Sequence, residues 1–279
     1  MGQHGDTITI LLLAIIGFTT YQGLHQPAII DKYLFSTEGI RFRKQWFRLI
    51  SPAFLHANWG HFAGNAITFF FFGSAIEDHF GSGLLLGLFF GSVAGGSLLC
   101  MLLHKTGDYR ALGASGGVLG ILFSAIILFP GMHIQIFPIP IGIPGWFYAV
   151  GYLAYTLFSM TGGSSVSHEG HLGGMLSGIL LTLIQNYRLF NAQPILITAL
   201  LVFSGAGIWY FHANPGRVPG FMGFQVRNKM DAVKAARQQR NESNLDSLLD
   251  KVSKEGLQSL TNRERQMLQD ASRKRGGRR

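Results

Sequence analysis

The chain has 279 residues, of which 48% are hydrophobic, and a formal net charge of +9. Only 15 charged residues lie in residues 1–216, whereas 22 lie in residues 217–279, which carry +8 of that net charge. This distribution excludes a soluble globular protein for most of the chain, and it assigns the basicity to a C-terminal tail rather than to a nucleic-acid-binding body.

Long uncharged segments divide the first 216 residues into candidate membrane helices. A helix needs about 20 apolar residues to cross the hydrocarbon core, and a charge at its centre is unfavourable. The segment 111–168 is long enough for two helices, and the proline-rich stretch 129–145 breaks it. We therefore predict seven spans, centred near residues 16, 69, 93, 121, 153, 179 and 203.

The connection after the first predicted helix, residues 31–48, interleaves basic and aromatic side chains. This mixture suits the lipid headgroup region. We interpret the first helix as a retained span, because no Lys or Arg precedes it and no convincing cleavage site follows it. The side chains concerned are Lys32, Arg41, Arg43, Lys44 and Arg48, with Tyr33, Phe35, Phe42, Trp46 and Phe47.

The second predicted helix begins with a polar group, His56, His61 and Asn65. His61 and Asn65 are four residues apart and share one helical face. Neutral donors inside a membrane suit a developing oxyanion, whereas without a nucleophile they would serve to cap or cross-link helices. Glu77, at the far end of the same helix, is predicted to be structural because it lies more than half a membrane thickness from Asn65.

The fourth predicted helix opens with the sequence Gly-Ala-Ser-Gly-Gly at residues 113–117. Glycines at this point allow a sharp turn and bring backbone N–H groups close to a reacting atom. The alternative is that Ser115 only bonds to its own helix backbone. A small-residue stripe that permits close approach of another helix is formed by Gly113, Gly116, Gly120 and Ser124.

The sixth predicted helix opens with His171, which shares one face with Gly174 and Gly178. If this glycine groove meets the stripe on the fourth helix, His171 comes within hydrogen-bonding range of Ser115 and can act as its general base. His168 and His171 are three residues apart, instead of the four of a zinc-protease signature, so we predict no metal.

The tail is predicted to begin at residue 215 and to contain a small helical hairpin. Apolar residues recur at helical spacing in 245–252, Gly256 is placed to end that helix, and Thr261 with Glu264 has capping-box spacing. A solvated tail attracted to lipid headgroups is favoured over a partner-binding module. The predicted division is a membrane core at 1–190, an additional helix at 191–214 and the basic tail at 215–279.

The order of these motifs resembles the rhomboid family of intramembrane serine proteases, over about residues 8–187. The resemblance implies that Ser115 is the nucleophile and His171 the base, and that His61 and Asn65 join the Ser115 N–H in holding the oxyanion. It also implies that His56 supports the site. The motifs in order are Arg48-Leu49-Ile50, Phe54-Leu55-His56, His61 and Asn65, then Gly73, Glu77 and Gly81, then Gly113, Ser115 and Gly116, then His171, Gly174 and Gly178.

Two positions depart from the family pattern. Phe47 separates Trp46 from Arg48, which are adjacent in many relatives, and Leu119 stands where relatives often have an aromatic ring stacked on the histidine. The second departure implies a less well oriented His171.

The sequence therefore predicts an all-α, polytopic, rhomboid-like bundle with six core spans and a seventh, an integral protein of a bacterial cytoplasmic membrane. The expected activity is serine endopeptidase cleavage of membrane-protein substrates, without a cofactor or nucleic acid and with the lipid bilayer as a partner. The alternative is a non-catalytic membrane chaperone or adaptor on the same fold.

Overall fold

The computed structural model describes residues 5–135, 141–162, 166–217, 244–261, 264–266 and 268. The chain forms two compact units, residues 1–226 and 227–279. Within the predicted break at 129–145, residues 136–140 lie outside the described residues. The predicted division at residues 190 and 215 stays a prediction.

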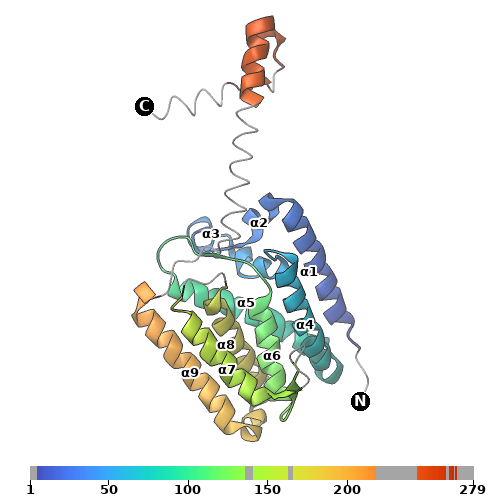
Figure 1. Cartoon of the computed structure of the whole chain (residues 1–279), viewed down its shortest axis with the longest axis vertical. Helices are drawn as coiled ribbons and strands as arrows, with labels where there is room; N and C mark the ends of the chain where they lie inside the picture. Colours follow the sequence, from blue (N-terminus) through green and yellow to red (C-terminus); the bar gives the residue numbers. More distant parts are fainter. Residues whose placement is uncertain are drawn as a thin grey trace. The chain divides into compact units, whose positions relative to one another are not determined.

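Helices dominate the chain (Figure 1), which confirms the predicted all-α class. In order, the elements of the first unit are α1 (Thr7–His25), α2 (Pro27–Tyr33), β1 (Phe35–Ser36), α3 (Thr37–Arg43), the 3-10 helices η1 (Trp46–Leu49) and η2 (Ser51–Phe54), α4 (Trp59–Phe80), α5 (Ser82–Leu103), β2 (Arg110–Ala111), α6 (Ser115–Leu128), β3 (His133–Ile134), β4 (Ile143–Pro144), α7 (Gly145–Ser159), α8 (His168–Gln185), η3 (Tyr187–Ala192), α9 (Pro194–Ala213) and η4 (Pro215–Arg217).

The helices α1, α4, α5, α6, α7, α8 and α9 lie at the seven predicted positions. By length and composition, α1, α5 and α9 are each long and apolar enough to cross a membrane, and α6 is a shorter apolar helix. The number of spans stays a prediction.

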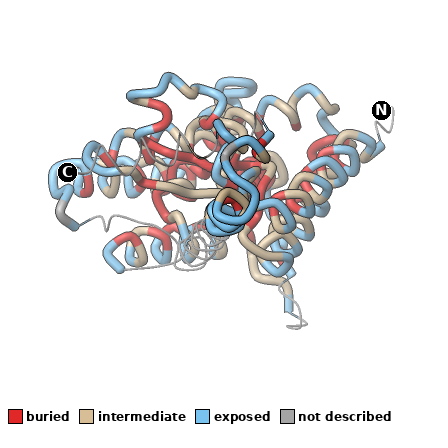
Figure 2. Tube along the Cα trace, turned by 90° about the horizontal axis from the view of Figure 1, so that it is seen from above, coloured by how far each residue is buried: buried red, intermediate tan, exposed pale blue. Residues whose placement is uncertain are grey.

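The centre of the first unit is formed by α5, α6 and α8, with α1 and α9 at opposite sides (Figure 1). Every residue of α6 from Gly117 to Ile127 is buried. The buried segments gather in the middle of the bundle when it is seen from above (Figure 2), and the outer helices expose apolar side chains such as Ile10 and Ile195. This arrangement is typical of helices that face lipid.

Glu77 is fully buried at the far end of α4, where it caps the N-terminus of α1. Its carboxylate accepts hydrogen bonds from the N–H groups of Ile8 and Thr9, at 2.9 and 2.8 Å, and from the hydroxyls of Thr9 and Ser82. The first N–H groups of a helix have no partner within that helix, so the carboxylate supplies the acceptors that α1 lacks. This contact agrees with the structural role predicted for Glu77.

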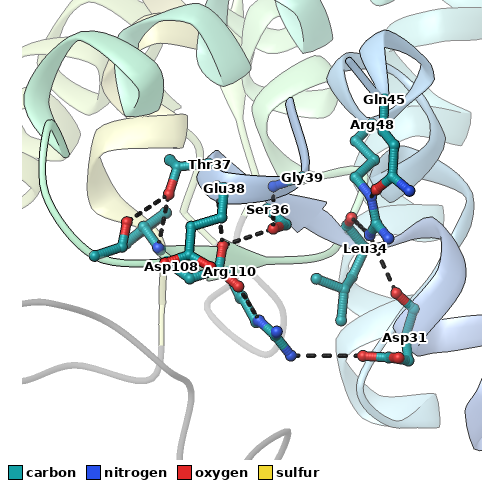
Figure 3. A network of polar contacts seen from close by, with 12 residues as sticks. Asp31, Leu34, Ser36, Thr37, Glu38, Gly39, Gln45, Arg48, Asp108 and Arg110 are labelled. Atoms are coloured by element: carbon teal, nitrogen blue, oxygen red, sulfur yellow. Dashed lines mark hydrogen bonds and ion pairs between the residues drawn. The ribbon is translucent and has the colours of Figure 1, made fainter. Parts of the chain in front are cut away.

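The connection between α1 and α4 is tied to the loop that leads into α6. Strands β1 and β2 pair antiparallel, with Phe35 opposite Ala111 and Ser36 opposite Arg110. A polar clamp, made of Asp31, Ser36, Asp108 and Arg110, lies beside this pair (Figure 3). Buried Arg48 donates to the carbonyl oxygens of Asp31 and Leu34, which holds the connection in one shape.

The second unit contains a helix at residues 244–255 and a 3-10 turn, η5 (Leu257–Ser259). Gly256, with φ +80°, follows the first helix as predicted. The Thr261 N–H donates to the Glu264 carboxylate at 2.7 Å, and the Glu264 N–H donates to the Thr261 hydroxyl, so the predicted capping box is formed. Of the predicted apolar face, Leu248 is buried but Leu249 is 47% exposed.

Candidate active site

Ser115 is the first residue of α6, and the backbone before it forms a turn that requires a glycine. Gly113 has φ +129°, which other residues rarely adopt, and its N–H donates to the Pro52 carbonyl oxygen at 3.0 Å. Because α6 begins at Ser115, the N–H groups of Ser115 and Gly116 have no partner within the helix. These two donors are available to an oxyanion at the helix N-terminus.

His171 lies in the first turn of α8 and meets Ser115 directly. Its Nε2 is 2.7 Å from the Ser115 Oγ, and the imidazole is buried. The turn is fixed by Ser167, whose hydroxyl accepts the Gly170 N–H. The structure thus brings together the serine and histidine that the sequence singled out, 56 residues apart.

The contact between α6 and α8, here called the glycine seam, consists of Gly116, Gly120, Gly174 and Gly178. A methyl group added at Gly174 would overlap the carbonyl oxygen of Gly116, and one at Gly178 would overlap that of Gly120. The Ser124 hydroxyl, one turn further along α6, donates to the Gly178 carbonyl at 3.1 Å. From Gly116 to Ser124 the predicted stripe meets the groove backbone to backbone, which is why the side chains at positions 115 and 171 are so close. Gly113, predicted as part of the stripe, instead precedes α6 and lies against the His61 ring.

Tyr152 on α7 contacts the other ring nitrogen of His171. Its hydroxyl lies 3.2 Å from His171 Nδ1, and the two ring centroids are 6.4 Å apart. If the imidazole Nδ1–H donates to this hydroxyl, Nε2 is left as the acceptor that a general base needs. Tyr152 was not identified from the sequence. Leu119, whose position implied a less well oriented His171, is buried in the apolar core.

His56 supports the turn before Ser115, from the loop between η2 and α4. Its Nε2 accepts the Ala114 N–H at 3.4 Å, and its Nδ1 lies 3.0 Å from the Thr20 hydroxyl. With Nε2 as an acceptor, the proton of the neutral ring is on Nδ1 and is donated to Thr20. The contact fits the supporting role that was expected of His56.

His61 and Asn65, the expected oxyanion donors on α4, are placed differently from one another. The His61 ring lies against Gly113, where a methyl group would come within 2.7 Å of its Cε1. The Asn65 Nδ2 donates to the His61 carbonyl at 3.0 Å, so one of its two N–H groups is used within α4. Neither residue lines the cavity beside Ser115.

A buried polar cluster lies behind the pair and received no function from the sequence. The Glu169 carboxylate is 3.3 Å from His104 Nε2 and 3.1 Å from the Tyr109 hydroxyl, which in turn lies 2.7 Å from the Ser167 Oγ. The His104 and Tyr109 rings stack with centroids 3.8 Å apart. The signal that could have identified the cluster is an acidic residue in an apolar segment, which needs a partner inside a membrane.

A small cavity of about 50 Å³ opens between Ser115 and His171 and the glycines around them. Its walls also include Pro52 and Ala53 of η2. A water molecule needs only about 10–15 Å³ of such space. The arrangement therefore combines a serine hydroxyl, a hydrogen-bonded imidazole, free backbone N–H groups and room for water, which are the elements of acyl transfer followed by hydrolysis.

Two family models match the chain. The rhomboid domain matches residues 43–188, which include α4 to α8 and every residue named above as part of the site except Thr20. Residues 229–274 match a family of unknown function, DUF6576.

Among curated relatives, the chain is 27% identical to RHOMBOID-like protein 12, mitochondrial, of Arabidopsis thaliana, over 61% of this chain and 55% of that protein. It is 29% identical to Rhomboid protein 1, mitochondrial, of Saccharomyces cerevisiae, over 47% and 40%. It is also 24% identical to Rhomboid protease GluP of Bacillus subtilis, over 60% and 32%. The chain thus spans about half or less of the length of these relatives.

Proposed function

Because the chain belongs to the rhomboid family, we propose that it is an intramembrane serine endopeptidase that hydrolyses peptide bonds in or next to the membrane helices of other proteins. One observation carries the proposal, the 2.7 Å contact between the Ser115 Oγ and His171 Nε2. A serine hydroxyl is a weak nucleophile until a base takes its proton, and a neutral imidazole in hydrogen-bonding contact is such a base.

In the proposed reaction, the Ser115 oxygen attacks the peptide carbonyl carbon while His171 Nε2 takes the hydroxyl proton. The developing oxyanion is held by the N–H groups of Ser115 and Gly116, with His61 and the second N–H of Asn65 as side-chain donors. His171 then gives its proton to the leaving amine as the C–N bond breaks, which leaves an acyl ester on Ser115. A water molecule then attacks the ester carbonyl carbon while His171 Nε2 takes its proton. His171 returns that proton to the Ser115 oxygen as the bond between the acyl carbon and this oxygen breaks, which releases the acid and restores the serine.

Besides the oxyanion donors, the residues proposed to act fall into three groups. Ser115 and His171 are catalytic, whereas His56, Gly113 and Tyr152 position the groups around them. Gly120, Gly174 and Gly178 set the distance between α6 and α8. The reaction requires no metal or cofactor, and its substrates are single-span or polytopic membrane proteins.

The test is labelling of the full-length, detergent-solubilised protein by a fluorophosphonate probe, which reacts with activated serines. Ser115→Ala and His171→Ala are expected to lose labelling by at least about 100-fold, because each removes one half of the pair. Ser204→Ala, at a buried serine of α9, is the matched control and should label as the wild type does. Equal labelling of Ser115→Ala and the wild type would refute the assignment, provided that all four proteins are shown to be folded by circular dichroism.

A non-catalytic chaperone or adaptor on the same fold is the second candidate, because the Arabidopsis thaliana relative is named RHOMBOID-like protein 12 rather than a protease. It is distinguished by a cellular assay of a membrane-protein client. If the Ser115→Ala variant rescues a deletion strain as fully as the wild type does, the adaptor function replaces protease activity as the proposed function.

The location proposed for this integral membrane protein is a bacterial cytoplasmic membrane, as the similarity to a Bacillus subtilis protein supports. Other relatives are mitochondrial. The proposed organisation keeps the membrane core at 1–190, the additional helix at 191–214 and the tail at 215–279.

A further inference from the structure

A groove of about 740 Å³ lies between α1, α2 and the 3-10 helices η1 and η2, away from the Ser115 cavity of about 50 Å³. Its size falls within the range of small-molecule binding sites, roughly 300–1,000 Å³. Its walls are mostly apolar and are formed largely by Ala28, Ile29, Phe47, Ile50, Phe54 and Leu55. A groove of this kind takes an extended hydrocarbon group.

Lys32 is the charged residue in the wall of this groove. Its ammonium group lies 5.0 Å from the centroid of the Tyr33 ring, and no carboxylate among the described residues pairs with it. The neighbouring Asp31 instead forms an ion pair with Arg110 at 3.5 Å. Among the described residues, the groove therefore presents one cation that no carboxylate pairs with, beside an apolar slot.

The segment from α3 to η1, which supplies Phe47 to the groove wall, carries side chains that are typical of the headgroup level of a bilayer. Phe42 is 78% exposed and Trp46 is 58% exposed, and the Lys44 ammonium lies 5.9 Å from the Trp46 ring centroid. Exposed aromatic rings next to lysines are the pattern of interfacial anchoring. An apolar groove that opens at this level faces acyl chains rather than water.

From the slot, its cation and its surroundings we infer that the groove binds an anionic phospholipid, with one acyl chain along Ile29 and Phe54 and the phosphate at Lys32. The inference does not require that the protein be a protease.

The lipid would also brace the wall that the groove shares with the Ser115 cavity. Ser51 and Phe54 of η2 line the groove, whereas Pro52 and Ala53 of the same turn line the cavity. Since the Gly113 N–H donates to the Pro52 carbonyl, a lipid that immobilises η2 also steadies the turn that precedes Ser115.

The experiment is native mass spectrometry of the full-length protein released from micelles containing phosphatidylglycerol or phosphatidylcholine. The wild type is expected to retain one phosphatidylglycerol in preference to phosphatidylcholine. Lys32→Gln should lower phosphatidylglycerol retention by about fivefold, as expected for the loss of one lysine near an anionic lipid, and leave phosphatidylcholine unchanged. Ile29→Trp, which fills the slot, should lower both.

Lys105→Gln is the matched control, because Lys105 is exposed and its amine lies near His212 rather than near the groove. Equal retention of the two lipids by the wild type would overturn the inference. So would unchanged retention in Lys32→Gln. If Ile29→Trp impairs cleavage of a membrane substrate but not lipid retention, the groove binds a polypeptide instead. Should Ile29→Trp fail to fold, Lys32→Gln decides alone.

Discussion

The glycine seam and the polar clamp hold Ser115 and His171 in place by opposite means. In the seam, α6 and α8 touch through the backbone at Gly116, Gly120, Gly174 and Gly178, and no charge is involved. In the clamp, the loop before Ser115 is held by the charged and hydroxyl groups of Asp31, Ser36, Asp108 and Arg110 (Figure 3).

The difference follows from the surroundings of the two regions. Inside a bilayer, the burial of apolar side chains gives almost no driving force for helix association, because lipid tails are equally apolar. Close packing of the two backbones must therefore provide the attraction between the helices. The clamp joins the connection that carries basic and aromatic side chains to the loop before α6, where water solvates charges and ion pairs are tolerated. Four substitutions test the comparison, and they are given in order of expected effect.

The largest effect is expected for Gly174→Ala, which places a methyl group against the Gly116 carbonyl and pushes α6 and α8 apart. Overpacking of this kind destabilises by about 3 kcal/mol, and fluorophosphonate labelling should be lost because Ser115 and His171 separate. The measurements are unfolding in mixed micelles and probe labelling. Gly87→Ala, in α5 with open space around its added methyl group, is the control. Wild-type stability in Gly174→Ala would show that the seam is loosely packed.

A smaller effect is expected for Glu169→Gln. Glu169 lies at the start of α8, where this helix meets the loop that carries Asp108 and Arg110. The neutral amide cannot replace both carboxylate contacts, to His104 and to Tyr109, so stability should fall by about 2 kcal/mol. Thermal unfolding monitored by circular dichroism measures it. Exposed Glu38→Gln serves as the reference variant and should change the unfolding temperature little.

The clamp itself is tested by the pH dependence of Asp108→Asn. Burial acts to raise the pKa of Asp108, but hydrogen bonds from Ser36, Arg110 and the Glu38 N–H outweigh it and hold that pKa below its ordinary value. The ionised carboxylate therefore stabilises the fold by about 1 kcal/mol above the unfolded-state pKa of about 3.9, and loses this contribution as the pH falls through the lowered pKa.

The stability difference between the wild type and Asp108→Asn should accordingly be constant from pH 7 to pH 5 and shrink towards pH 3. Melting curves at each pH measure this difference. Asp78→Asn, outside the clamp, provides the comparison. A difference that grows on acidification would contradict the assignment.

The smallest effect is expected for Tyr152→Phe, which removes only the hydroxyl at His171 Nδ1 and leaves the seam intact. Stability should be close to wild type, whereas the rate of fluorophosphonate labelling should fall by about three- to tenfold, as the preferred tautomer of His171 is lost. Its labelling rate is compared across pH with that of Tyr148→Phe, the stacked neighbour. Identical pH profiles for both variants would show that the Tyr152 hydroxyl does not position His171.

The sequence predicted the helices well because uncharged stretches between Asp6 and Arg217 are bounded by clear polar residues. The family match confirms the resemblance inferred from motif order. The seam was also foreseeable, since Gly174 and Gly178 share a face with His171 at helical spacing. A periodic pattern on one helix needs no knowledge of the rest of the fold.

Contacts that join distant segments through single side chains were not foreseeable. Nothing in the sequence around Tyr152 marks its hydroxyl as the partner of His171, because aromatic residues are frequent in this chain and only the packing of α7 selects one. His104 and Tyr109 likewise acquire their relation to Glu169 only when the end of α5 meets the start of α8. The Asn65 amide donates a hydrogen bond to the carbonyl of its own helix. The spacing between His61 and Asn65 does not determine whether the amide makes this bond or points towards Ser115.

The Glu77 cap on α1 has a consequence for the order in which the molecule is built. During synthesis α1 emerges before α4, yet the acceptors for the N–H groups of Ile8 and Thr9 lie 68 to 69 residues later in the chain. Until α4 has been made, the beginning of α1 depends on water or lipid headgroups for those hydrogen bonds. The cap of α1 therefore forms only after α4 has been synthesised, and a nascent chain that stalls before residue 77 would leave α1 without it.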